Sequence, residues 1–142
     1  MSEKDVVKEL NAYLKGEYMG IHAYEHYIHH TQDPHIRTEL QRLQQDHKQH
    51  AAKIAERIQD LGGQAVMDNG IKLSMMEFMM NIKGYPDSTE RILKGVLNGQ
   101  MKGIEASEDL VRGDLDDTSL QLVKQNLAED RDHIDQLNRL MS

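Results

Sequence analysis

Apolar residues recur every three or four positions in four separate stretches of the chain, the spacing that places them on one face of an α-helix. We therefore predict helices over residues 3–31, 34–61, 88–112 and 118–141. Short breaks separate the first helix from the second and the third from the fourth, so each pair is predicted to form a helical hairpin. The apolar positions expected on the buried faces include Val6, Leu10, Leu14, Ile21, Ile28, Ile36, Leu40, Leu43, Ile54, Ile58, Leu120, Val123, Leu127, Ile134 and Leu137.

The breaks between these helices contain residues that end or begin helices. Pro34 cannot continue the first helix, and Asp33 before it is a good N-cap for the second. Gly62 is placed to end the second helix, because glycine adopts the conformation of a helix C-terminal cap without strain. Asp87 and Ser88 are expected to cap the third helix.

The two hairpins are joined by a long connection, residues 62–88, which is rich in glycine. Residues 74–80 within it form a short apolar piece that we expect to be a short helix. A helix of about 27 residues is about 40 Å long, and a connection of this length can return along it. The sequence therefore predicts an all-α fold, an antiparallel four-helix bundle with one long crossover. We expect residues 1–142 to form a single domain.

Composition excludes several classes of function. The chain has no cysteine, which excludes disulfide scaffolds, thiolate zinc sites and iron–sulfur clusters. Its formal net charge of −7 disfavours binding to nucleic acid or to anionic membranes. The polar start and the absence of a long apolar run predict a cytoplasmic protein with no membrane segment.

The two hairpins resemble each other at a fixed offset of 83 residues. Shifted by this offset, residues 14–28 match residues 97–111 at six of fifteen positions. The same offset also aligns the second helices of the two hairpins, which indicates an internal repeat. Three pairs of polar residues become equivalent, namely Glu17 with Gln100, His47 with Asp130, and His50 with His133.

These polar residues interrupt or border the apolar stripes, so they are expected inside the bundle. Burying a polar group without a partner destabilises a fold by roughly 1–3 kcal/mol, so six such residues in one bundle need an explanation. The spacing of His47 and His50, and of Asp130 and His133, puts each pair on one helical face. Imidazole and carboxylate groups from facing helices are a usual set of ligands for a divalent metal. The alternative is a buried hydrogen-bond network that holds no metal.

Three segments of the chain resemble the ferritin-like di-iron carboxylate superfamily, and within it bacterioferritin most closely. The run from Leu10 to Tyr24 is similar to the family's first helix, with Glu17 at the position of a metal-ligand glutamate. The segment that begins His50-Ala51 is similar to the end of the second helix, with His50 at a ligand position. Asp130-Arg131-Asp132-His133 is similar to the last ligand motif of the family.

The resemblance implies a ferritin-like fold and a metal site, but two ligand positions depart from the family pattern. The family uses Glu, Glu-x-x-His, Glu and Glu-x-x-His, whereas His47 and Gln100 stand here in place of two bridging carboxylates. Such a set suits one ion or an asymmetric pair better than two ferric ions. Asp46 is a spare carboxylate beside the stripe. Lys48 follows the position of the helix-B glutamate, where bacterioferritins carry the haem-binding methionine, so no haem is expected.

The sequence thus predicts a metal-binding bundle with iron, one or two ions, as the first choice and zinc or manganese as alternatives. If the protein is an enzyme, the resemblance implies oxidation of Fe(II), a ferroxidase-type activity. The alternative is a degenerate, non-enzymatic bundle with a structural, stress-related or interaction role. We expect a homo-oligomer, with a dimer favoured. The predicted metal ligands are Glu17, His47, His50, Gln100, Asp130 and His133.

Three further features have two interpretations each. Tyr24 lies two turns beyond Glu17 and is either a core residue or a neighbour of the site. The methionine-rich piece of the crossover covers the bundle or a subunit partner, with metal binding by thioethers as the weaker alternative. The histidines of the first helix are either an exposed metal-chelating edge or solvated side chains. They are His22, His26, His29 and His30.

Overall fold

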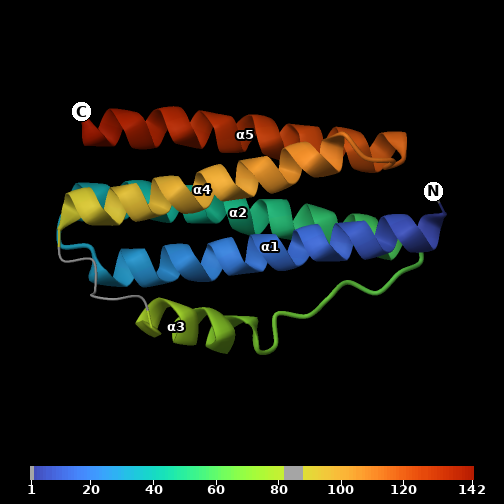
Figure 1. The fold of residues 1–142 in the computed structure, drawn as a ribbon, viewed down its shortest axis with the longest axis horizontal. Coiled ribbons are helices and arrows are strands. Elements are labelled where there is room, and N and C mark those ends of the chain that lie inside the picture. The colour runs from blue at the N-terminus through green and yellow to red at the C-terminus, as the bar shows by residue number, and fades with distance from the viewer. Residues whose placement is uncertain (1, 82–87) are drawn as a thin grey trace.

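The computed structural model describes residues 2–81 and 88–142 of the chain. In these ranges all regular structure is helical, which confirms the all-α prediction (Figure 1). The predicted boundaries of the four long helices agree with the structure to within about one residue. The helices are α1 (Glu3–His30), α2 (Pro34–Asp60), α3 (Ile71–Asn81), α4 (Thr89–Val111) and α5 (Asp117–Met141).

Side-chain caps define where the long helices begin. Asp33 accepts hydrogen bonds from the backbone N–H groups of His35 and Ile36, directly before Pro34. Ser88 accepts from the N–H of Arg91 at the start of α4, as expected; its predicted partner Asp87 lies outside the described residues. After α2, Gly62 has a φ of 81°, a conformation that glycine adopts without strain.

The four long helices form two antiparallel hairpins, α1–α2 and α4–α5, that pack against each other through α1 with α4 and α2 with α5 (Figure 1). The connection after α2 runs back along the bundle before α3 begins, so the predicted crossover is confirmed over residues 62–81. The short helix α3 packs on α1. Among the described helices, none combines the length and the apolar character that crossing a membrane requires.

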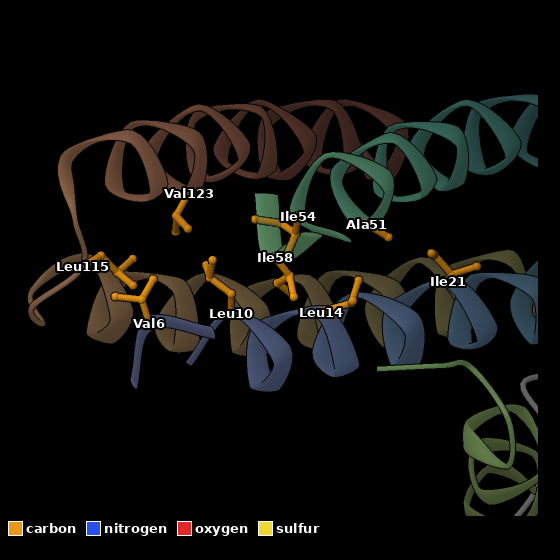
Figure 2. Packing of buried hydrophobic residues seen from close by; sticks show 9 residues of the cluster. All are labelled: Val6, Leu10, Leu14, Ile21, Ala51, Ile54, Ile58, Leu115 and Val123. Carbon is orange, nitrogen blue, oxygen red and sulfur yellow. The ribbon is translucent and has the colours of Figure 1, made fainter. Parts of the chain in front are cut away.

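Two apolar clusters fill the bundle, one toward each end. The first is shown in Figure 2 and comprises Val6, Leu10, Leu14, Ile21, Ala51, Ile54, Ile58, Leu115 and Val123. The second comprises Tyr24, Ile36, Leu40, Leu43, Ile92, Leu93, Val96 and Leu137. Each fully buried Leu or Ile contributes roughly 1.5–3 kcal/mol of stability. The clusters therefore supply the stability that allows a polar layer to be buried between them.

Candidate metal centre

The six predicted ligand residues lie together in that polar layer, one or two from each long helix. Their side chains are buried, with relative exposures between 1% and 7%. Each hairpin contributes three of them, which agrees with the internal repeat. They are Glu17 from α1, His47 and His50 from α2, Gln100 from α4, and Asp130 and His133 from α5.

His47 has an acceptor oxygen next to each of its ring nitrogens. Its Nδ1 lies 2.9 Å from Oε2 of Glu17, and its Nε2 lies 3.0 Å from Oε1 of Gln100. Burial acts to lower the pKa of His47, but the hydrogen bond and charge of Glu17 outweigh it and raise the pKa to about 9. Burial likewise acts to raise the pKa of Glu17, but the two histidines hold it at about 2. In the metal-free protein, His47 and Glu17 thus form a buried ion pair.

Gln100 of α4 connects all four long helices, since it bonds His47 of α2 as well as residues of α1 and α5. Its Oε1 accepts a hydrogen bond of 3.0 Å from the hydroxyl of Tyr24, so this tyrosine is a neighbour of the site as well as a core residue. The Nε2 of Gln100 donates to Oδ1 of Asp130 at 3.2 Å and to Nδ1 of His133 at 2.9 Å. The amide therefore takes part in bonds through both of its polar atoms.

The outer ring nitrogens of the other two histidines are held by carboxylates. Nε2 of His50 lies 2.9 Å from Oε2 of Glu129, and Nε2 of His133 lies 2.8 Å from Oδ2 of Asp46. A carboxylate at Nε2 favours the tautomer with its proton there, which leaves the lone pair on Nδ1, the nitrogen that faces the interior. Such carboxylate–histidine pairs are the usual support of metal-ligating histidines.

The inward nitrogen of His50 is the atom of the site that lacks a partner. Its Nδ1 is buried and makes no hydrogen bond to any described residue. It lies 3.8 Å from Oε1 of Glu17 and 3.8 Å from Oδ1 of Asp130. A lone pair that faces two carboxylate oxygens needs a proton or a metal ion between them. Burial first, and then the charge of Glu17, raise the pKa of Asp130 to about 6, although His47 opposes the rise.

The site contains two overlapping groups of atoms that are close enough to hold an ion. One group is formed by Glu17, His47 and His50, and the other by His47, Asp130 and His133. In each group the candidate ligand atoms lie within 4.8 Å of one another. These two are the groups of three or more such residues within the described ranges, and neither contains a histidine of the edge predicted on α1. His22 of that edge instead pairs with Asp68 of the crossover, with Nε2–Oδ2 at 2.8 Å.

Sequence reasoning missed or misplaced three residues of the site. The apolar pattern does not identify Glu129 and presents Asp46 only as a spare carboxylate, although the repeat makes the two equivalent by the same offset of 83. The pattern also placed Ile134 in the stripe with His133 beside it. The structure reverses this order, because His133 is 1% exposed and held by Asp46 and Gln100, while Ile134 is half-buried.

The chain is similar to one protein family and to several solved structures. The family described as domain of unknown function DUF2383 matches residues 5–113. No curated protein matches the sequence. Many solved structures share the fold, and three of them are described below, at identities that establish the fold alone. They confirm that the bundle is ferritin-like.

A two-domain protein of Anabaena variabilis, with a DJ-1/ThiJ/PfpI-like and a ferritin-like domain, aligns with a TM-score of 0.87 and 18% identity over 99% of this chain. The chain spans 40% of that protein. A dodecameric thioferritin of Bacteroides fragilis aligns with a TM-score of 0.79 and 20% identity, over 98% of this chain and 85% of the thioferritin. A ferritin-like diiron-carboxylate protein of Bacillus anthracis aligns with a TM-score of 0.73 and 23% identity over the full length of both chains.

Proposed function

We propose that this chain, which belongs to the DUF2383 family, binds one divalent metal ion, iron in the first place, inside its ferritin-like bundle. Zinc and manganese are the alternatives, because imidazole and carboxylate ligands suit all three ions. The ion's ligands are Glu17, His47, His50, Asp130 and His133, with Gln100 as a weak ligand or hydrogen-bond donor.

The observation that carries this proposal is the unpartnered Nδ1 of His50. The two carboxylate oxygens at 3.8 Å belong to α1 and α5, while His50 itself belongs to α2. Two atoms 3.8 Å apart can both bond one ion at about 2 Å, so Nδ1 of His50 can share an ion with either of these oxygens. Glu129 supports the arrangement, since it holds the ring of His50 with this nitrogen pointing inward.

Charge favours one ion over two. Glu17 and Asp130 supply two negative charges, which one divalent ion neutralises. A pair of ferric ions carries six positive charges, and His47 and Gln100 stand where the family's pattern has further carboxylates. Binding also requires His47 to lose the proton that it shares with Glu17, because a ligating imidazole is neutral.

Fe(II)-oxidising activity is the finer form of this proposal. A bound iron supplies the redox chemistry, and the protein holds its ligands and excludes bulk water. The resemblance of three ligand segments to bacterioferritin supports this reading. The hydroxyl of Tyr24, 3.0 Å from Gln100, orients that amide toward Asp130 and His133.

Elemental analysis of protein purified without a histidine tag tests the proposal. We expect one ion per chain after anaerobic Fe(II) loading, and a rise in ferric absorbance on exposure to air if the protein is a ferroxidase. His50→Ala should lose the metal, whereas His22→Ala is a matched control, because that histidine pairs with Asp68 outside the site. If the wild-type protein bound no metal after loading with iron, zinc or manganese, the proposal would be overturned.

The second candidate is a metal-free bundle in which the polar layer fixes how the helices pack. The ion pair of His47 with Glu17 and the fully engaged Gln100 favour it, because they satisfy much of the layer without a metal. Under this alternative, His50→Ala changes stability and no variant changes metal content.

We further propose that the chain acts in the cytoplasm as one domain and forms a homo-oligomer, with a dimer favoured. The dodecameric thioferritin among the similar structures and the exposed apolar side chains around α3 support self-association. Sedimentation analysis tests this, with Phe78→Ser as the variant expected to shift the protein toward the monomer. The exposed side chains are Met67, Leu73, Met76 and Phe78.

A further inference from the structure

Three histidines form a cluster on the last two turns of α1, outside the buried centre. The ring centroids of His26 and His30 are 4.6 Å apart, and those of His29 and His30 are 5.2 Å apart. The fourth histidine of this helix, His22, bonds Asp68 of the crossover instead. The histidine edge that the sequence predicts is therefore divided into one pair with the crossover and one cluster of three imidazoles, which we call the histidine cluster.

The histidine cluster is separate from the buried centre. Along α1, His26 lies nine residues after Glu17, which is about 14 Å at 1.5 Å per residue. Neither of the two groups of atoms that can hold an ion in the centre includes a residue of the cluster. The two places can therefore be occupied, or altered by mutation, independently of each other.

The repeated fold does not need imidazoles at these positions. At the offset of 83 residues, His26 and His29 correspond to Asp109 and Arg112, which form an exposed ion pair on the second hairpin. That hairpin packs into the bundle without a histidine there. The cluster is therefore an addition to one copy of the hairpin, and the packing of the bundle does not explain it.

His26 and His30 have the spacing of a chelating pair. Residues four apart lie on one face of a helix, and two histidines at this spacing bind zinc on the helices of metalloproteins. Rings with centroids 4.6 Å apart can each offer one nitrogen to a shared ion with bonds of about 2 Å. The ring of Tyr27, 5.8 Å from that of His26, packs against the second apolar cluster and limits the movement of this imidazole.

Both rings of the pair are half-buried, and His26 is in the form that binds metals. Burial lowers the pKa of His26, and the charges of His30 and His29 lower it further. Its imidazole is therefore neutral at pH 7 and binds an ion without first releasing a proton. In the buried centre, by contrast, His47 must lose its proton before it binds a metal.

We propose that His26 and His30 form a peripheral site that chelates one divalent transition-metal ion of the class that prefers imidazole ligands. Zn²⁺, Ni²⁺ and Cu²⁺ belong to this class, whereas Mg²⁺, Ca²⁺ and Mn²⁺ prefer oxygen ligands. His29 is exposed and stands outside the row of residues four apart, so it is not a ligand. Water molecules complete the coordination of the ion.

The peripheral site binds metal more weakly than the buried centre, because it has only two protein ligands. An ion held by two imidazoles exchanges with the solution and is removed by gel filtration, so it does not add to the ion count of the buried centre. While it is bound, the ion links the last two turns of α1. It therefore stabilises this end of the helix in proportion to its occupancy.

Retention of the tag-free protein on an immobilised Ni²⁺ column tests this proposal. The imidazoles of the buried centre are 1–7% exposed and cannot reach an ion that is fixed to a resin. We expect the wild type to be retained, and His26→Gln or His30→Gln to pass through. His29→Gln and, on α2, His35→Gln are the matched controls, because both histidines are exposed. These two variants should be retained like the wild type.

Calorimetric titration with Ni²⁺ measures the same site in solution. In His50→Ala, which lacks a ligand of the buried centre, we expect one Ni²⁺ per chain. Adding His30→Gln should weaken this binding roughly 100-fold, because one imidazole is left without its chelate partner. Equal losses of binding in His29→Gln and His30→Gln would overturn the proposal, and so would unchanged retention of His26→Gln and His30→Gln. Either failure leaves the proposed function of the buried centre unaffected, since that centre shares no residue with the cluster.

Discussion

Asp46 and Glu129 each bind a histidine of the opposite hairpin. Asp46 of α2 binds His133 of α5 at 2.8 Å, and Glu129 of α5 binds His50 of α2 at 2.9 Å. The two carboxylates are related by the internal repeat, and so are the two histidines. The crossed pairs join the two hairpins and fix the direction in which both imidazoles present Nδ1.

Removing one of these carboxylates should weaken metal binding without removing a ligand. We expect Asp46→Asn to lower metal affinity by about 10- to 100-fold, because the ring of His133 loses its orientation and its preferred tautomer. Calorimetric titration with zinc measures the change. Asp132→Asn, an exposed acidic residue on the same helix as His133, is the charge-matched control and should leave affinity unaltered. Equal losses in both variants would point to a general charge effect.

The metal-free protein should lose stability as the pH rises from 6.5 toward 9. His47 has a pKa of 6.5 as an ordinary side chain and about 9 in the fold, so its protonated form stabilises the fold below 6.5 and this contribution disappears through 9. The shift corresponds to about 3 kcal/mol. The pKa of Asp130 is raised from 3.8 to about 6, so the stabilisation by its protonated form is lost as the pH rises through that lower range.

Glu17 affects the stability of the protein at low pH. Its pKa is lowered from 4.5 to about 2, so its contribution is present above 4.5 and is lost as the pH falls toward 2. Chemical denaturation as a function of pH measures the profile. The variant His47→Gln should show a smaller decline above 6.5, and not none, because Glu17, against the effect of burial, also raises the pKa of His50. A decline of unchanged size in this variant would refute the assignment.

Periodicity was sufficient to predict the helices, because caps and apolar spacing are local properties of the chain. It also predicted all six residues of the polar layer, since each interrupts or borders a stripe in a repeated position. It could not identify Glu129, whose side chain is 45% exposed and looks like any surface glutamate of an acidic chain. Its role depends on the crossing of α2 and α5, a tertiary relationship.

The burial of Asn126 is not predicted by the pattern for a related reason. Asn126 stands next to Leu127 in the stripe of α5, and nothing local shows that it, too, is buried. The repeat carries the signal, since its equivalent is Leu43 in the core. Comparing the two halves position by position is therefore more informative for this chain than hydropathy alone.

Two glycines of α4 should respond in opposite ways to alanine. A Cβ at Gly99 meets nothing within 4 Å, so Gly99→Ala should stabilise the protein by about 0.5–1 kcal/mol through the higher helix propensity of alanine. A Cβ at Gly95 would lie 2.5 Å from the hydroxyl oxygen of Tyr27, whose ring must then move. Thermal unfolding should therefore rank Gly95→Ala below Gly99→Ala. An equal rise in the unfolding temperature of both variants would show that the ring of Tyr27 moves aside without a loss of stability.

Restoring carboxylates at the two departing positions should change the number of ions that are bound. Gln100→Glu gives α4 the same residue as its repeat partner Glu17, and His47→Glu replaces the buried imidazolium by an anion. The double variant carries four carboxylates and two histidines. We expect it to be less stable than the wild type without metal, because four buried carboxylates repel one another and lose the cation that offsets them.

With metal present, the same double variant should bind two ions per chain where the wild type binds one. Elemental analysis after Fe(II) loading counts the ions, and ferric absorbance in air reports oxidation. Gln44→Glu is the control, because it replaces a buried amide of α2 by a carboxylate outside the six ligand residues. In the wild type, that amide bonds Ile21 and Glu25. If the double variant still binds one ion, the spacing of the helices, and not the missing charge of His47 and Gln100, limits the centre to a single metal.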